Sequence, residues 1–238
     1  MKLTAKGISK QFLRQREGSN VFYAVQETDF ALEEGRLTVI TGRSGGGKST
    51  LLNMLSGLLS PTSGSILADE TDLYSLEDTA LSAFRNQHFG MIPQGQTAIF
   101  SLTVEENILL PLTIYGLQKK DPAAYEAAKA YAKELMAMTD IADLGPVMPS
   151  ELSGGEMRRM AIARALIRHP DVVFADEPTG DLDDKNTQII LQLLKQIAEQ
   201  GTAVLLVTHE KAALDYADIL YRMDAGQLTP GQAAAETD

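Results

Sequence analysis

The chain has 238 residues, of which 44% are hydrophobic and 22% charged, a composition that is typical of a folded globular protein and excludes a disordered one. Lys and Arg number 21 against 32 Asp and Glu, and the net charge of −11 argues against nucleic acid as a partner. There is no cysteine, which excludes disulfides and thiolate metal sites.

Apolar segments that alternate with turn-forming residues predict a succession of strands and helices. In chain order these are strands over 3–12, 24–32 and 37–41, a helix over 50–56, a strand over 90–92, helices over 123–138 and 153–168, a strand over 172–175, a helix over 185–200, and strands over 203–207 and 219–223. Strands that alternate with helices favour an α/β fold in which a mostly parallel sheet is covered on both faces.

The middle of the chain has stronger helix signals than its flanks. Thr103–Glu106 has the form of a capping box, and Asp121 precedes a proline at the start of an alanine-rich segment. We therefore expect a single domain that is interrupted by a helical insert. Its parts are an α/β core over about 1–73 and 151–230, the insert with many helices over about 74–150, and a fraying polar tail over 231–238.

One glycine-rich loop has the spacing of a phosphate-binding loop, G-x-x-x-x-G-K-[ST]. It follows a predicted strand and precedes a predicted helix, where backbone N–H groups can cradle phosphates; a chance glycine-rich turn does not account for that context. Lys48 can reach the β- and γ-phosphates of a nucleotide, and the Ser49 hydroxyl can bind Mg²⁺. The residues expected to bind nucleotide here are Gly42, Arg43, Ser44, Gly45, Gly46, Gly47, Lys48, Ser49 and, in the following helix, Thr50.

Two carboxylates follow the buried-strand pattern over 172–175. Such a strand end supplies the second acidic position that a site for Mg²⁺ and a triphosphate needs. Successive residues point in different directions there, so we expect Asp176 to hold the metal through water and Glu177 to act as general base toward the attacking water. An ordinary acidic turn is the alternative, and it is less favoured because the same chain contains a phosphate loop.

A second candidate anion site begins the predicted helix over 153–168. Ser153 and Glu156 fit an ordinary capping box, but capping does not require the two glycines between them, which cost helix stability. Bare N–H groups at a helix N-terminus bind anions. Two such helix ends with only one phosphate loop suggest that the second site completes the nucleotide pocket of another copy of the chain.

The phosphate loop, the motif Leu152-Ser153-Gly154-Gly155-Glu156, the Asp176-Glu177 strand end and His209 together resemble the nucleotide-binding subunit of ATP-binding-cassette (ABC) transporters. The resemblance covers nearly the whole chain, and the motif Leu152–Glu156 is highly specific. Arg43 in place of a commoner proline and Glu156 in place of glutamine remove no phosphate ligand. The resemblance implies a RecA-like P-loop NTPase core with an N-terminal antiparallel β-subdomain and an inserted α-helical subdomain. It also implies hydrolysis of ATP with Mg²⁺, a head-to-tail dimer around two ATP molecules, and a membrane permease as partner.

The resemblance also assigns roles to residues on both sides of that dimer. Ser153, Gly154 and Gly155 would contact the γ-phosphate held by the opposing subunit. Gln94 would touch Mg²⁺ and relay to the membrane partner, and Gln96 is the weaker candidate for that role.

Three further residues match single positions of the family. Asp183 matches the aspartate loop that lines the dimer interface, and His209 matches the switch histidine near the γ-phosphate. Phe12 matches the N-terminal aromatic residue that stacks on adenine, and Tyr23 is the alternative. Without the resemblance, a lone histidine at a strand end and an aromatic residue on a strand are more often structural.

Three features resemble the group of ABC subunits that exports macrolides, peptides or lipoproteins. They are the long turn between Phe12 and Tyr23, the segment from Glu106 to Leu112, and Glu177-Pro178-Thr179-Gly180. We therefore expect the chain to power a separate permease that exports or extracts a peptide, macrolide, lipid or lipoprotein-like substrate. A cell-division pair in the same group transports nothing, so an ATP-driven switch that acts through a membrane partner is the alternative.

Other branches of the family fit less well. Branches for DNA repair and chromosome organisation carry coiled coils or zinc modules, for which this chain has neither room nor cysteine, and translation factors join two cassettes. No apolar run reaches the roughly 18–20 residues of a membrane span, and the N-terminus has no signal-peptide pattern. We expect the chain at the cytoplasmic face of the plasma membrane, held there by its permease. Apolar Ile99, Phe100 and Leu102, in a predicted loop, mark the expected docking surface, with core packing as the alternative.

Overall fold

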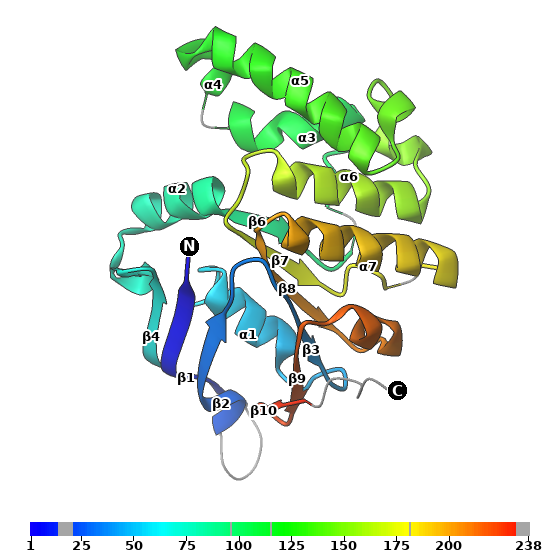
Figure 1. Cartoon of the computed structure of the whole chain (residues 1–238). Helices are drawn as coiled ribbons and strands as arrows, with labels where there is room; N and C mark the ends of the chain where they lie inside the picture. Colours follow the sequence, from blue (N-terminus) through cyan, green and yellow to red (C-terminus); the bar gives the residue numbers. More distant parts are fainter. Residues whose placement is uncertain (14–20, 96, 115, 181, 232–238) are drawn as a thin grey trace.

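Two β-sheets and a layer of helices make up the chain (Figure 1). Some parts of the chain lie outside the described residues. Among them are residues 14–20 of the long turn, Gln96, Asp181, and the polar tail apart from Gly231. The computed structural model describes residues 1–13, 21–95, 97–114, 116–180 and 182–231.

The N-terminal sheet is the antiparallel β-subdomain that the resemblance implies. Its strand order is β2-β1-β4-β5, and each neighbouring pair is antiparallel. The register places Phe12 opposite Phe22, so two aromatic residues are paired at one end of this sheet. The strands are β1 (Leu3–Leu13), β2 (Val21–Leu32), β4 (Ser63–Ala68) and β5 (Thr71–Asp72).

The second sheet is mostly parallel, as predicted, with the order β10-β9-β3-β8-β7-β6. Only its edge strand β10 is antiparallel to its neighbour among the described strands. Parallel strands share one carboxyl edge, so the loops that follow β3, β7 and β8 meet there. The strands are β3 (Leu37–Thr41), β6 (Phe89–Ile92), β7 (Val172–Asp176), β8 (Ala203–Thr208), β9 (Ile219–Asp224) and β10 (Gln227–Pro230).

Helices cover both faces of the parallel sheet. Helix α1 (Lys48–Leu55) contacts strands of both sheets and therefore fills the space between them. Alternate residues of β8 show that α7 (Asp184–Glu199) lies on the other face: Leu205 belongs to the same core cluster as α1, whereas Leu206 belongs to the cluster with α7. This alternation is the period-2 pattern of a strand buried on both sides.

A layer of helices lies on one side of the parallel sheet (Figure 1). Helix α6 contacts α3 and α5 as well as strand β6. The helices of this layer are α3 (Val104–Thr113), α4 (Leu117–Lys120), α5 (Pro122–Met138) and α6 (Gly154–Leu166), with the short 3₁₀ helices η2 (Ala142–Leu144) and η3 (Pro149–Glu151) in the same part of the chain. Helix α2 (Asp78–His88) lies apart from the layer and contacts β6 (Figure 1), while the short helices η1 (Leu73–Ser75) and η4 (Lys211–Tyr216) contact β4 and α7, respectively.

The helical layer differs in two ways from the insert expected over about 74–150. Strand β6 lies inside that stretch but pairs with β7 in the parallel sheet, and α6 follows the stretch but packs on its helices. The boundary of the helical layer is therefore set by packing and not by position in the chain. The two capping signals are confirmed: Thr103 and Glu106 form a capping box on α3, and Asp121 caps α5.

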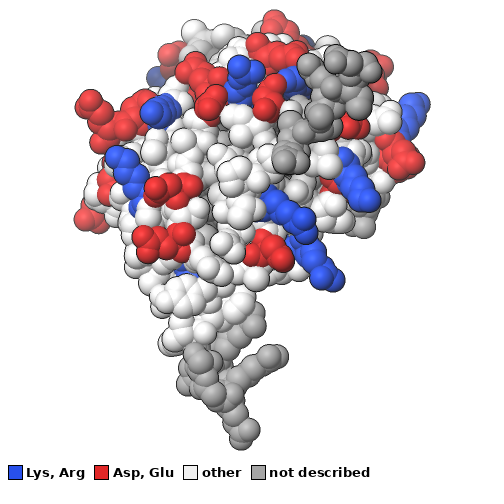
Figure 2. Space-filling view, turned by 60° about the horizontal axis from the view of Figure 1, so that its bottom comes forward, with Lys and Arg blue, Asp and Glu red and all other residues white. Residues whose placement is uncertain are grey.

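The surface gives two further observations. No helix in the described part of the chain is long and apolar enough to cross a membrane. On the face shown in Figure 2, acidic and basic side chains are interspersed rather than gathered by sign.

Candidate active site

The phosphate loop connects β3 to α1. Gly42, Gly45 and Gly47 have positive φ angles of 157°, 77° and 105°, which glycine adopts at little steric cost. A Cβ on Gly47 would lie only 2.1 Å from the carbonyl oxygen of Ala24 on strand β2. Helix α1 begins directly after this glycine, at Lys48, two residues earlier than predicted. The glycines therefore set both the shape of the loop and its close packing on the antiparallel sheet.

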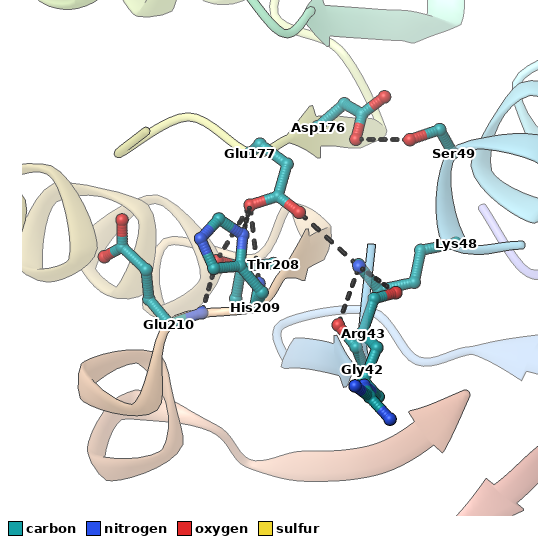
Figure 3. A network of polar contacts seen from close by, with 9 residues as sticks. All are labelled: Gly42, Arg43, Lys48, Ser49, Asp176, Glu177, Thr208, His209 and Glu210. Carbon is teal, nitrogen blue, oxygen red and sulfur yellow. Dashed lines mark hydrogen bonds and ion pairs between the residues drawn. The ribbon is translucent and has the colours of Figure 1, made fainter. Parts of the chain in front are cut away.

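Lys48 is buried, and its ammonium group turns back beneath the loop (Figure 3). Its Nζ donates hydrogen bonds to the carbonyl oxygens of Gly42 at 2.8 Å and Arg43 at 3.2 Å. The same nitrogen lies 3.5 Å from Glu177 Oε1. A buried ammonium is costly unless it is paired. These contacts hold the positive charge at the phosphate loop, where phosphate oxygens can replace the carbonyl groups.

At the end of β7, Asp176 faces the start of α1. The Ser49 hydroxyl donates a hydrogen bond of 2.9 Å to Asp176 Oδ1. Burial raises the pKa of Asp176 above its usual value, and this hydrogen bond partly offsets the rise. A hydroxyl beside a carboxylate supplies the hard oxygen donors that Mg²⁺ prefers. The described residues contain no group of three or more acidic or histidine side chains that could hold a metal.

Glu177 points away from Asp176, as expected for successive residues at a strand end (Figure 3). It has a φ of 47°, a left-handed conformation that strains any residue but glycine and is concentrated at functional sites. Its Oε2 lies 2.7 Å from His209 Nδ1 and accepts longer bonds of 3.4 Å from the Thr208 hydroxyl and the His209 backbone N–H. With Lys48 at Oε1, the carboxylate is oriented from both sides, which suits a general base.

An open cavity of about 390 Å³ lies beside the phosphate loop. Phe12 lines it, whereas Tyr23, the alternative aromatic residue, does not. Phe22 also lines the cavity, although the sequence did not predict it. The alternating pattern of a strand does not show which end of a strand pair lies near the phosphate loop. Gln94 approaches from the segment after β6. The full lining is Phe12, Phe22, Ala24, Ser44, Gly45, Gly47, Lys48, Ser49, Thr50, Gln94 and Glu177.

The residues Ser153, Gly154 and Gly155 do not line this cavity but begin helix α6. The Ser153 hydroxyl accepts a 3.3 Å hydrogen bond from the Glu156 N–H, and Glu156 Oε2 accepts one of 2.7 Å from the Ser153 N–H, so the predicted capping box is present. A Cβ on Gly155 would lie 2.7 Å from Asn186 Oδ1, whereas one on Gly154 would meet only Leu182 Cδ2, at 3.7 Å. Packing within one chain thus requires the second glycine but not the first.

Asp183 also lies at a helix start away from the cavity. It caps α7, with its Oδ1 accepting a 2.8 Å hydrogen bond from the Asn186 N–H. These hydrogen bonds lower the pKa of the exposed Asp183 carboxyl. The structure therefore brings Lys48, Ser49, Glu177 and Gln94 around one cavity and leaves Asp183 and the Ser153 motif outside it.

Comparison with known proteins agrees with this geometry. A family model described as ABC transporter matches residues 25–180. The chain is 37% identical over 223 residues to the lipoprotein-releasing system ATP-binding protein LolD of Treponema denticola, covering 93% of this chain and 95% of that protein. The chain belongs to the ABC transporter family. It is also 41% identical over 213 residues to the methionine import ATP-binding protein MetN of Latilactobacillus sakei, but spans only 59% of that protein's length.

Solved ABC cassettes have the same fold. The dimeric structure of the bacterial ABC transporter cassette MJ0796 superposes with a TM-score of 0.84 at 30% identity, covering 98% of this chain and all of that one. A post-hydrolysis state of MJ0796 bound to ADP and Pi gives a TM-score of 0.83. The predicted family, fold class and ATPase activity are confirmed. The chain is an ATP-binding, ATP-hydrolysing subunit of an ABC transporter.

Proposed function

We propose that two copies of the chain close head to tail around two Mg²⁺-bound ATP molecules and hydrolyse them to drive a membrane permease. The observation that carries this proposal is Gly154, an exposed glycine at a helix N-terminus for which packing within one chain gives no reason. The bare N–H groups at the N-terminus of α6 are suited to bind a phosphate, yet this helix end does not line the cavity at the phosphate loop. A second copy would bring this helix end to the open side of the cavity. The related MJ0796 cassettes, described as dimeric, support the proposal.

In this dimer Glu177 acts as the general base. It takes a proton from a water molecule as the water oxygen attacks the γ-phosphorus, and ADP and inorganic phosphate are the products. His209 orients the carboxylate at 2.7 Å. Lys48 and the loop N–H groups bind the phosphates, Phe12 stacks on adenine, and Asp183 lies at the interface between the copies.

The Mg²⁺ ion would be held by Ser49, by Asp176 through water, and by Gln94. When bound, it offsets the negative charge of the phosphates. Ser153, Gly154 and Gly155 of the second copy would complete the site by donating N–H and hydroxyl hydrogen bonds to the γ-phosphate.

The proposed transport is export or extraction of a lipoprotein-like substrate, with peptides, macrolides and lipids as related classes. LolD relatives match over nearly their whole length, whereas the match to the importer MetN spans little more than half of it. The proposed docking surface is the loop with Ile99 and Phe100, which are 41% and 51% exposed, so core packing does not account for them. Docking there would hold the chain at the cytoplasmic face of the inner membrane.

The Glu177→Gln variant tests the dimer. It should bind ATP but not hydrolyse it, so light scattering should give twice the monomer mass with ATP and the monomer mass with ADP. A variant that binds ATP tightly and stays monomeric would contradict the proposal.

A pull-down of the tagged chain from detergent-solubilised native membranes tests the partner. Mass spectrometry should identify a multispanning protein with a large extracytoplasmic domain. Recovery of an envelope enzyme's membrane regulator would instead favour the non-transporting switch, and recovery of no membrane protein would contradict the docking proposal. The ATPase chemistry would stand in each case.

A further inference from the structure

Two arginines of helix α6 hold the segment that carries Gln94. Arg158 Nη1 donates hydrogen bonds to the carbonyl oxygens of Pro93 at 2.9 Å and Gly95 at 3.2 Å. Arg164 Nη1 donates to the Thr97 carbonyl oxygen at 2.8 Å, and its Nη2 donates to Thr97 Oγ1 at 2.6 Å. The two guanidinium groups thus reach residues on both sides of Gln94.

The described residues around Gln94, 93–95 and 97, belong to no helix or strand, so no regular element supports them. Pro93 has no N–H to donate, and Gly95 has a φ of 86° with nothing within 4 Å of the position of a Cβ. Pro93 thus removes one backbone donor beside Gln94, and Gly95 adds conformational freedom on the other side. The position of Gln94 in the cavity must therefore be supplied from outside the segment.

Helix α6 is suited to supply it. Ser153 and Gly154 lie at its N-terminus, and Arg158 follows Gly154 by about one helical turn. The other side of the helix reaches the start of α7, where Arg159 Nη1 donates a 3.0 Å hydrogen bond to Asn186 Oδ1. Since a helix moves as a rigid body, a shift of its N-terminus is passed to the arginines and to the carbonyl groups that they hold.

We propose that Arg158 and Arg164 are positioning residues, which set the place of Gln94 in its own phosphate site according to the position of helix α6. The N-terminus of that helix is the part that would meet the nucleotide of the second copy. When the N-terminus of α6 closes on the nucleotide of the second copy, the position of Gln94 in the first copy's own phosphate site would change. This inference rests on the roles proposed above for Gln94 and for the dimer.

The chemistry favours arginine at both positions. A guanidinium group is planar and has five N–H donors in a fixed arrangement, so Arg164 can donate from Nη1 and Nη2 to two acceptors of Thr97 at once, whereas the lysine ammonium is a compact charge on a flexible stem. The Arg164 guanidinium is largely withdrawn from water, which lowers its pKa from the usual value. The hydrogen bonds to Thr97 therefore replace hydrogen bonds to water that the guanidinium has lost. Without Arg164, Thr97 would have no donor in the same position.

The test compares Arg158→Met and Arg158→Lys with a control, Arg85→Met, in the full chain. Arg85 is also half-buried and also donates to a backbone carbonyl, that of Gly57 at 2.7 Å, but on helix α2. We expect Arg158→Met to lower kcat about tenfold, the loss typical of a charge-assisted hydrogen bond, with ATP affinity within about twofold. Hydrogen exchange of a peptide over 93–97 should be faster in this variant and not in the control. Arg158→Lys should recover part of kcat.

Gln94→Ala separates this inference from the proposed function. If Gln94→Ala lowers kcat while Arg158→Met changes neither kcat nor exchange over 93–97, the positioning role is wrong and the role of Gln94 stands. If Gln94→Ala leaves kcat and its Mg²⁺ dependence unchanged, the proposed role of Gln94 is wrong and the positioning inference fails with it. If Arg85→Met lowers kcat as much as Arg158→Met does, general destabilisation explains the result and the inference is overturned. The milder Arg158→Lys variant gives the same comparison should Arg158→Met not fold.

Discussion

The cavity at the phosphate loop and the N-terminus of α6 are the two places where we propose that phosphate binds, and they differ in how far one chain organises them. At or beside the cavity, Lys48, Asp176 and Glu177 are buried, and each has a partner from a distant part of the chain. At the helix end, Ser153 and Gly154 are exposed, and the capping bonds join residues only three positions apart.

The difference indicates which parts of the proposed shared site one chain can organise by itself. A buried ammonium and two buried carboxylates are stable only if they are paired, so they must be fixed before a nucleotide arrives. An exposed helix end carries no such penalty, because water satisfies its N–H groups until a ligand replaces it. The following changes would test this comparison.

The largest effect is expected for Lys48→Ala. Removing a buried cation that pairs with Glu177 and faces the phosphates should weaken ATP binding about 100-fold, the result of losing about 3 kcal/mol of charge-assisted hydrogen bonds. Fluorescent-nucleotide titration of the monomer measures this. Ser153→Ala is the matched change at the helix end and should leave the affinity of the monomer within about twofold. Equal losses in the two variants would remove the distinction between the two regions.

A smaller effect is expected at the two glycines of α6, and it should differ between them. Gly155→Ala should lower the free energy of unfolding by about 1–3 kcal/mol, because its Cβ would lie 2.7 Å from Asn186 Oδ1. Gly154→Ala should instead raise it by about 0.5 kcal/mol, since alanine favours a helix. Urea unfolding measures both.

The same Gly154→Ala variant should nevertheless hydrolyse ATP more slowly, because its methyl group would lie where the nucleotide of the second copy is proposed to approach. Full ATPase activity in a stabilised Gly154→Ala variant would contradict a phosphate role for this helix end.

The smallest effect is expected for Glu156→Gln. The hydrogen bonds from Ser153 lower the pKa of the Glu156 carboxyl below its usual 4.5, so its stabilising contribution is complete above that pH and is lost as the pH falls through the lowered value. Glutamine preserves the capping box but not the charge near the helix N-terminus, so stability at pH 7 should fall by about 0.3–1 kcal/mol. Urea unfolding should show a larger difference at pH 7 than at pH 3, and an equal difference at both would contradict it.

The amino-acid sequence by itself determined the features that are local along the chain. The phosphate loop between β3 and α1, the two carboxylates at the end of β7 and the capping box at Ser153 are each encoded within a few consecutive residues. Spacing alone is enough in such cases, because neighbours in sequence share one loop or one helical turn. The strands and helices around these motifs followed for the same reason, whereas β4, β5, α2, α4 and β10 were not predicted.

Only the tertiary structure decided which of these local features meet. Three contacts join residues that are distant in the chain. His209 contacts Glu177, Gly155 packs against Asn186, and Arg158 donates hydrogen bonds to carbonyl groups on both sides of Gln94. Such contacts depend on strand order and on the packing of helices across a sheet. Hydrophobic periodicity does not specify either of them, since the same apolar face can pack against several neighbours.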